Sequence, residues 1–591
     1  MRAPLLEKPL GGRTLAVIPA ALFVALALTY SASITNHLTG DSVWYAHDIL
    51  APSEQFFHPH HLMYNPLMRA MLAPFGPFMD GVDARLRYLQ WVNVVITSLA
   101  MTSLCVLMLR LGADAPHACL FTLIPGLSAF FCATSSQIEV YGITVLCLCV
   151  ASLGLVRTEQ GGRGRLLTAL GYAAGMLFHQ TAIFFGLAIL VHEVARHRVE
   201  RAGLIRKLIL TLVLPVGAVG LIYIAVGAGI GYRDPVSFWR WLTTHAQAGY
   251  WGKGTLSIFT LRTALGNLLN SLVARGPGMG WARPLLFLGA MALGTVAAVT
   301  AWARGGLRHA SLVAAALAWI AALACFSVWW DAREAEYWGM VLVPVCLVLA
   351  LITTPATLGH TPVALRLMST ACFIAGLLLL LGSVVVHHRL SLRPNLVWEA
   401  ARTLPRVARD GDLIWAANTG NSTLYRIYMG SRPLTVLAID VKPAREAARQ
   451  STPATFTPAL IEYLGAQVRA VESGGGRCLM DRWALEGKVP TTRLMKDIDL
   501  EEFTQAMRDR FSAGPVGEGE EPFFYVLHAA GSLPSRSLGV RPSNGSGRVA
   551  SAAGLDPRKR DEVDARHRRG ALTKETAPCA RPKSLLGHTP G

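Results

Sequence analysis

Long apolar runs without a charged side chain alternate with short polar stretches along most of the chain. The first such run lies between Arg13 and Asp41, and runs of similar length recur as far as Arg389. A helix needs about 20 apolar residues to cross the hydrocarbon layer of a bilayer. The pattern therefore predicts an α-helical polytopic membrane protein with about eleven membrane helices.

Basic residues between the runs predict the orientation of these helices. Lys and Arg collect on cytoplasmic loops, and three of them lie among the first 13 residues. This puts the N-terminus in the cytoplasm and the loop that begins at Asp41 outside. At residues 167–192 the alternation of inside and outside loops conflicts with the positions of the basic residues. A single crossing there would leave the basic segment 192–207 outside.

A hairpin of two short helices within 167–192 removes this conflict. The two helices would meet near His179 and Gln180, where a polar break interrupts the apolar run. Non-helical backbone is tolerated at membrane depth when protein buries it or when it lines a cavity. A single crossing is the alternative. With the hairpin, the last span leaves the membrane near residue 388, and the C-terminal part of the chain lies outside.

The composition divides the chain into three parts. Residues 1–388 carry the apolar runs and form the predicted multi-spanning domain. Beyond them, apolar runs such as 412–416 and 523–527 are typical of buried strands, and residues 389–530 fit a small extracytoplasmic α/β domain. Ser, Gly, Pro and Arg dominate residues 531–591, which predicts a basic disordered tail.

The net charge of +18 reports topology rather than a nucleic-acid partner. The tail has 12 Lys and Arg against 5 Asp and Glu, so +7 of the +18 lies there. Much of the remainder flanks the spans, which leaves no basic face that would indicate nucleic-acid binding. Most of the 10 cysteines lie in apolar runs, and no Cys/His spacing typical of zinc is present.

Four polar features fall on the outer face in this topology. Ionisable groups are costly near the membrane and usually have a function there. The first feature is Asp41 with His58, His60, His61 and Tyr64; the second is Gln137, Glu139 and Tyr141; the third is His179 and Gln180; the fourth is Asp331, Arg333 and Glu334, followed by Glu336. Because all four features lie on the same side of the membrane, they predict a substrate site there.

Each feature also has a simpler structural interpretation. Asp41 could cap the helix that follows it, Glu139 could snorkel to water, and His179 could be a satisfied buried histidine. Asp331 and its neighbours could form a solvated turn. The histidines around Pro59 suggest a metal cluster, but their adjacency does not suit ligands on one helix face. No cofactor is therefore predicted, and a divalent metal stays an unsupported alternative.

Short motifs in residues 14–190 follow one another in a recognisable order. They are Gly40-Asp41, His58-Pro59, Tyr64-Asn65-Pro66-Leu67, Glu139-Val140-Tyr141 and His179-Gln180-Thr181. This order resembles the GT-C superfamily of polyprenyl-phosphate-dependent glycosyltransferases, and most closely its protein O-mannosyltransferase-like branch. The doubled His60-His61 and the α/β domain depart from the pattern of that branch.

The resemblance implies a membrane glycosyltransferase, mannosyltransferase-like in this branch. A sugar would pass from a polyprenyl-phosphate donor to a protein, lipid or glycan acceptor at the outer face of the cytoplasmic (inner) membrane, in contact with membrane lipid. Asp41 would be the general base for the acceptor hydroxyl. Arg333 or the first-loop histidines would stabilise the leaving phosphate. The other candidates named above would bind substrate.

Two other functions compete with this interpretation. A transporter or lipid flippase would be expected to show internal repeats and charges near mid-membrane, whereas the sequence has neither. A membrane scaffold whose outer domain binds a partner would leave the first-loop acid Asp41 without a role.

Overall fold

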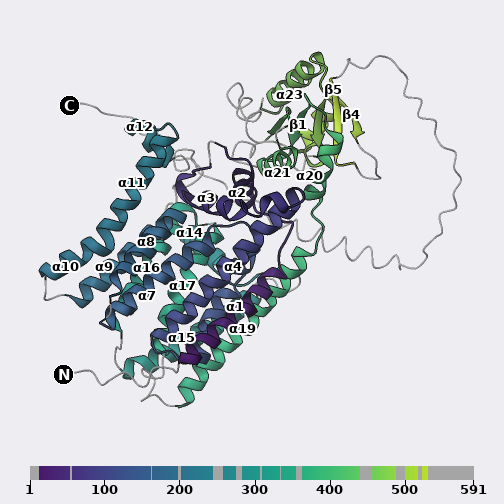
Figure 1. Ribbon diagram of the computed structural model, residues 1–591. Coiled ribbons are helices and arrows are strands. Elements are labelled where there is room, and N and C mark those ends of the chain that lie inside the picture. The colour runs from purple at the N-terminus through teal and green to yellow at the C-terminus, as the bar shows by residue number, and fades with distance from the viewer. Residues whose placement is uncertain are drawn as a thin grey trace, which may run out of the picture. The chain divides into compact units, whose positions relative to one another are not determined.

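The computed structural model describes residues 12–529 with several internal gaps (Figure 1). The gaps are 54–55, 162, 198–200, 244–256, 275–281, 306–308, 333, 354–362, 431, 440–455, 487–499 and 517–521. The predicted site residue Arg333 and the predicted tail 531–591 thus lie outside the described residues.

Long apolar helices make up the larger part of the fold (Figure 1). Within the described ranges, 7 helices are long and apolar enough to cross a membrane, or 8 if one bent pair counts as a span. These seven lie in α4 (Gly81–Arg110), α7 (Tyr141–Glu159), α11 (Leu214–Gly229) with the preceding α10 (Arg201–Leu208) and π-helix η4 (Ile209–Val213), α15 (Ala282–Gly305), α16 (Ala310–Asp331), α17 (Ala335–Ile352) and α19 (Val363–Ser391). The bent pair is α5 (Ala115–Gly126) and α6 (Ala129–Ser135), which meet at 68°.

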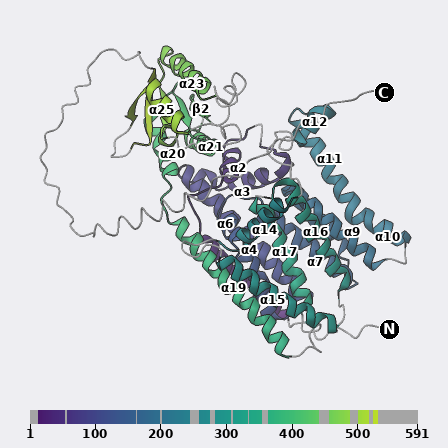
Figure 2. The same ribbon diagram turned by 180° about the vertical axis from the view of Figure 1, so that it is seen from behind.

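Shorter apolar helices complete the bundle. Helix α1 (Gly12–Ser31) packs on α4, and α8 (Arg165–Phe178) packs on α7. In the view from behind, α15 and α19 run side by side, in agreement with their extensive packing (Figure 2). The chain is therefore a multi-pass membrane protein, as the apolar pattern predicts. The described ranges hold 7 or 8 candidate spans rather than about eleven, because apolar helical stretches such as those of α1 and α8 are shorter than a full span.

The segment after α8 folds back on itself. A 3-10 turn, η3 (Gln180–Phe184), follows α8 and leads into α9 (Phe185–Arg196). The Nε of Arg165, at the start of α8, lies 3.8 Å from Oε1 of Glu193, near the end of α9. Both ends of the segment therefore lie at the same end of the bundle. This confirms the predicted hairpin, and His179 lies at its turn.

Short helices gather at the opposite end of the bundle from Arg165. Between α1 and α4 they are α2 (Gly40–Leu50), η1 (Pro59–His61), α3 (Tyr64–Leu72) and η2 (Gly76–Phe78). Two more helices, α12 (Pro235–Leu242) and α14 (Ile258–Leu272), follow α11. Figure 1 shows α2, α3 and α12 at this same end.

A five-stranded sheet follows the bundle. The strands are β1 (Leu413–Ala416), β2 (Thr435–Ala438), β3 (Cys478–Asp481), β4 (Phe511–Val516) and β5 (Phe524–Ala529), in the order β2-β1-β3-β5-β4. The helices are α20 (Leu396–Val407), α21 (Thr419–Met429), α23 (Phe456–Ser473), α24 (Arg482–Leu485) and α25 (Leu500–Arg510).

The sheet explains why its first strands are continuously apolar. Strands β2, β1 and β3 are parallel, and Leu413 pairs with Thr435 on one side and Cys478 on the other. Central parallel strands are covered on both faces, so their residues need no polar alternation. All four residues of β1 are buried accordingly. The small α/β part of the predicted fold is confirmed, and its helix α21 packs against α2.

Candidate active site

Segments that carry the four predicted features meet at the α2 end of the bundle. The ring of His179 lies 4.9 Å from that of His61 and 5.4 Å from that of Tyr141. The ring of His60 lies 6.1 Å from that of Trp330, which directly precedes Asp331. The first loop, the start of α7, the hairpin turn and the end of α16 therefore surround one region.

Asp41 occupies the first turn of α2 without capping it. The N-cap is Thr39, whose hydroxyl accepts a hydrogen bond from the backbone N–H of Ser42. This removes the interpretation of Asp41 as a helix cap. An acid in the first turn is favoured by the helix dipole. The Asp41 side chain is exposed on one side, and burial by the protein around it raises the pKa of its carboxyl above the usual value.

Glu139 lies beneath the start of α2 and is only 1% exposed. Its Oε1 accepts hydrogen bonds from the hydroxyls of Thr39 at 2.7 Å and Ser42 at 2.8 Å. Its Oε2 is buried and has no hydrogen-bond partner among the residues that the structure describes. Burial, then the carboxylates of Glu336 and Asp41, raise the pKa of Glu139 well above its usual value, although the two hydroxyl donors oppose this.

Gln137 holds the same turn of α2. Its Oε1 accepts from the backbone N–H of Thr39 at 2.7 Å and from the Ser42 hydroxyl at 3.1 Å. Gln137 and Glu139 therefore fix the helix turn that carries Asp41. Thr39 and Ser42 were not predicted as site residues, although a hydroxyl residue before a helix, followed by a second one three residues later, is a recognisable signal of such a turn.

His179 is held as a neutral imidazole at the hairpin turn. Its Nδ1 accepts from the backbone N–H of Thr181 at 3.1 Å, so the ring proton belongs on Nε2. Burial lowers the pKa of His179 to about 3. The ring can therefore donate one N–H to a ligand at neutral pH but supplies no positive charge.

Tyr141 joins the start of α7 to the start of α17. Its hydroxyl donates to Oε2 of Glu336 at 2.5 Å. Glu336 is half-buried and belongs to the site. The sequence places it with the fourth polar feature, but the predicted substrate-binding residues stop at Glu334. The sequence feature that could have added Glu336 to the predicted site is its place in the acidic run that begins at Asp331.

The first-loop histidines surround a turn that other segments fix. The Pro59 carbonyl accepts from Nε2 of Gln180 at 2.9 Å and from the Tyr223 hydroxyl at 2.7 Å. The rings of His58 and His61 stack with centroids 5.6 Å apart. Within the described ranges, no group of three or more His, Cys, Asp or Glu side chains is arranged to hold a metal ion.

The remaining predicted residues have different degrees of burial. Tyr64 is fully buried, its ring centroid 5.2 Å from that of Tyr45, and its hydroxyl has no hydrogen-bond partner among the described residues. Asp331 ends α16 and is 9% exposed. Glu334 is exposed where α17 begins.

Comparisons with known proteins identify the fold. No protein-family model and no curated protein sequence matches the chain. The crystal structure of ArnT from Cupriavidus metallidurans bound to undecaprenyl phosphate is similar at a TM-score of 0.52 and 12% identity, over 88% of this chain and 100% of that one. The apo structure of the same protein gives 0.51 and 13%, over 86% and 97%. At such identities the likeness concerns the fold alone: the chain has an ArnT-like fold, in agreement with the GT-C-like fold expected from the sequence, whereas the likeness to ArnT does not support the O-mannosyltransferase-like branch.

Proposed function

We propose that the protein is a GT-C glycosyltransferase that moves a sugar from a polyprenyl-phosphate donor to an acceptor hydroxyl. The fold supports this proposal, because the similar structures are those of ArnT, a glycosyltransferase, and one of these structures contains undecaprenyl phosphate. The observation that carries it is Asp41, a partly open carboxylate at the end of a membrane bundle, on a turn fixed by buried polar groups.

The reaction assigned to Asp41 is general-base catalysis. Its carboxylate takes the proton of the acceptor hydroxyl while that oxygen bonds to the anomeric carbon of the sugar. The bond between this carbon and the phosphate oxygen breaks, and the polyprenyl phosphate leaves with the electron pair. A positioned base typically contributes about 10²–10⁴-fold to the rate. The raised pKa of Asp41 suits this role, because a base with a pKa nearer the working pH accepts a proton more readily.

The leaving phosphate needs hydrogen-bond donors or positive charge. We assign donor contacts to the Nε2–H of His179 and to the first-loop residues His58, His60 and His61, with Arg333 as the cation. A preformed donor aimed at developing charge is a strong source of transition-state stabilisation. Tyr64, Gln137, Glu139, Tyr141, Gln180, Asp331 and Glu334 complete the proposed substrate-binding set. Of these, Gln137 and Glu139 act through the turn of Asp41, to which they are hydrogen-bonded.

The finer assignments belong to the same proposal. We place the site on the extracytoplasmic face of the cell membrane, with the N-terminus in the cytoplasm, because basic residues precede the first span. The acceptor is a protein, lipid or glycan hydroxyl. The resemblance of the motifs favours a mannosyl donor, while the fold is shared with ArnT, so the sugar is best identified by competing donors that carry different sugars on one polyprenyl phosphate.

The decisive test is Asp41→Asn in purified protein with a polyprenyl-phospho-sugar donor. We expect kcat to fall about 10²–10⁴-fold while donor binding is kept, because asparagine has the same shape but cannot take a proton. The matched control is Asp80→Asn. Asp80 is an exposed acid at the start of α4 whose side chain makes no capping hydrogen bond, so its change should leave the rate unchanged. Normal turnover by Asp41→Asn would refute the assignment of the base.

A further inference from the structure

The linker between α1 and α2, residues 32–39, runs beside the chain that enters the α/β part. The ring Nδ1 of His388 lies 2.6 Å from the Ala32 carbonyl, and Nε2 of His37 lies 3.1 Å from the Arg393 carbonyl. These contacts join positions about 356 residues apart in the chain. The linker ends at Thr39, the cap of the helix that carries Asp41.

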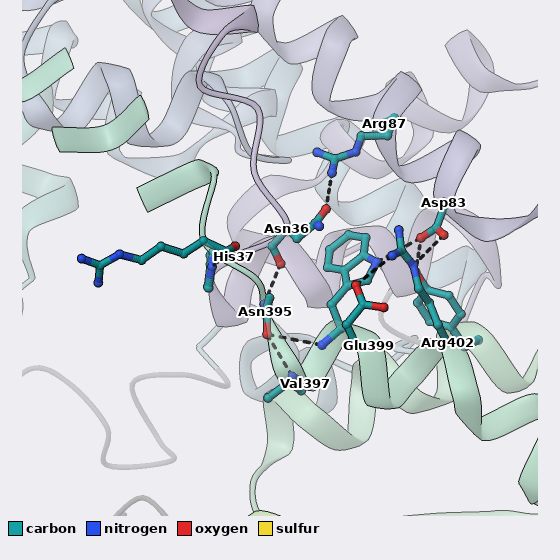
Figure 3. Close-up of polar contacts among 11 residues, drawn as sticks. Asn36, His37, Asp83, Arg87, Asn395, Val397, Glu399 and Arg402 are labelled. Atoms are coloured by element: carbon teal, nitrogen blue, oxygen red, sulfur yellow. Dashed lines mark hydrogen bonds and ion pairs between the residues drawn. The ribbon is translucent and has the colours of Figure 1, made fainter. Parts of the chain in front are cut away.

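Asn395 makes the most specific contact with this linker (Figure 3). Its Oδ1 caps α20 by accepting from the backbone N–H groups of Val397 at 3.0 Å and Trp398 at 3.3 Å. Its Nδ2 donates to the Asn36 carbonyl at 2.7 Å. One amide therefore caps a helix of the α/β part and holds the linker, and each function uses a different atom.

Helix α4 makes further contacts with the linker and with the α/β part beside Asn395. Arg87 of α4 donates to the Asn36 side chain, as Figure 3 shows. One turn earlier on α4, Asp83 accepts from Nε1 of Trp398 at 3.0 Å and from Nε of Arg402 at 2.8 Å, and also from the Tyr428 hydroxyl. Helices α20 and α21 are thus fixed to the same helix that holds Asn36.

We propose that Asn395 is a positioning residue, through which the α/β part holds the α1–α2 linker and thereby the first turn of α2. This inference rests on the proposed function for its catalytic consequence. The path is short: Asn36 is three residues before Thr39, and Thr39 is also held by hydrogen bonds to Gln137 and Glu139. The α/β part is then needed for alignment of Asp41, although none of its described residues belongs to the predicted site.

The test separates the two functions of the amide. Asn395→Asp keeps the oxygen that caps α20 and removes the N–H that holds Asn36. Asn395→Ser also keeps a good cap and is too short to reach the linker. We expect amide hydrogen exchange in residues 33–42 to become about three- to tenfold faster in both variants, as for the loss of one hydrogen bond. We expect kcat to fall by a similar factor at unchanged donor KM.

The control is Glu399→Gln on the same helix. The Oε1 of Glu399 accepts from Nη1 of Arg402 at 2.8 Å (Figure 3). Among the described contacts, Glu399 has none with the linker, so neither exchange nor kcat should change. Unchanged exchange in residues 33–42 of Asn395→Asp overturns the proposal, and so does faster exchange with a normal kcat. A wild-type protein that transfers no sugar overturns the proposed function instead, and the exchange measurement then still decides whether Asn395 holds the linker.

Discussion

Two clusters of acids, each with one buried glutamate, lie at opposite ends of the same helices and differ in their partners. At the α2 end, the buried Glu139 accepts only from hydroxyls among the described contacts, and other carboxylates lie nearby. At the other end, Glu193 is fully buried between two basic side chains. Its oxygens lie 3.8 Å from Nε of Arg165 and 3.4 Å from Nε2 of His197.

The second acid of the Arg165 end repeats this pairing. Glu159, the last residue of α7, lies 2.9 Å from Nδ1 of His309 and 3.6 Å from Nε2 of His192, and it accepts from the Ser311 hydroxyl. These contacts tie the ends of α7, α9 and α16 together. At the Arg165 end the acids thus lie beside arginine and histidine side chains, and these contacts close the bundle.

The difference separates stabilising acids from acids that a function requires. A buried carboxylate with a cationic partner is compensated, and removal of one partner is costly. A buried carboxylate near other carboxylates reduces stability, and such groups cluster at functional sites. Glu139 belongs to the second kind, in keeping with its place beneath Asp41.

The largest stability effect should come from Glu193→Gln. This change leaves Arg165 and His197 without their carboxylate. Breaking a fully buried pair costs about 3–5 kcal/mol, and partial exposure of Arg165 reduces this to about 2–4 kcal/mol. The measurement is the unfolding midpoint of the purified protein. Sugar transfer by the folded fraction should stay within about twofold of wild type, because Asp41 lies at the other end.

The matched change at the α2 end, Glu139→Gln, should affect stability in the opposite way from Glu193→Gln. A carboxyl whose pKa is raised by folding adds stability below its unfolded pKa, about 4.3, and loses that contribution as the pH rises. Glutamine still accepts from Thr39 and Ser42 but carries no charge. The variant should therefore be at least as stable as wild type at pH 8. A loss as large as that of Glu193→Gln would refute the comparison.

Lowering the pH should reduce the stability of the α2 end by protonating His179. Its pKa falls to about 3 on folding from about 6.5 in the unfolded chain, so the stability present above pH 6.5 is lost as the pH falls. At pH 5 this loss amounts to about 2 kcal/mol. His179→Asn keeps an acceptor for the Thr181 N–H and should remove that part of the pH dependence. Equal acid sensitivity in both proteins would show that the ring is not held neutral.

Patterns local in the sequence account for what could be predicted. Apolar runs gave the spans, the excess of basic residues at 192–207 gave the hairpin, and continuous apolar strands gave the sheet. The grouping of Asp41, His61 and His179 followed from topology, because each lies at the same end of its span. Each of these inferences needs only neighbouring residues and the alternation of sides.

Side-chain pairing over long separations could not be predicted in this way. Thr39 and Glu139 are 100 positions apart, and Asn36 and Asn395 are 359 apart. A hydrogen bond between such residues leaves no periodic signal in either segment. Glu139 was therefore predicted as a substrate residue, whereas its described hydrogen bonds go to the turn of Asp41, and that assignment stays a prediction.

The smallest predicted effect compares two hydroxyls that serve the two kinds of acid. Ser42 donates to Glu139 and Ser311 donates to Glu159. Ser42→Ala removes one of the two donors that Glu139 has and should cost about 1.5 kcal/mol, whereas Ser311→Ala leaves the pairs of Glu159 with histidine and should cost about 0.5 kcal/mol. Unfolding midpoints measure both. Only Ser42→Ala should also lower kcat, because Ser42 lies in the same helix turn as Asp41; a lower kcat in Ser311→Ala would show that the two ends are coupled rather than separate.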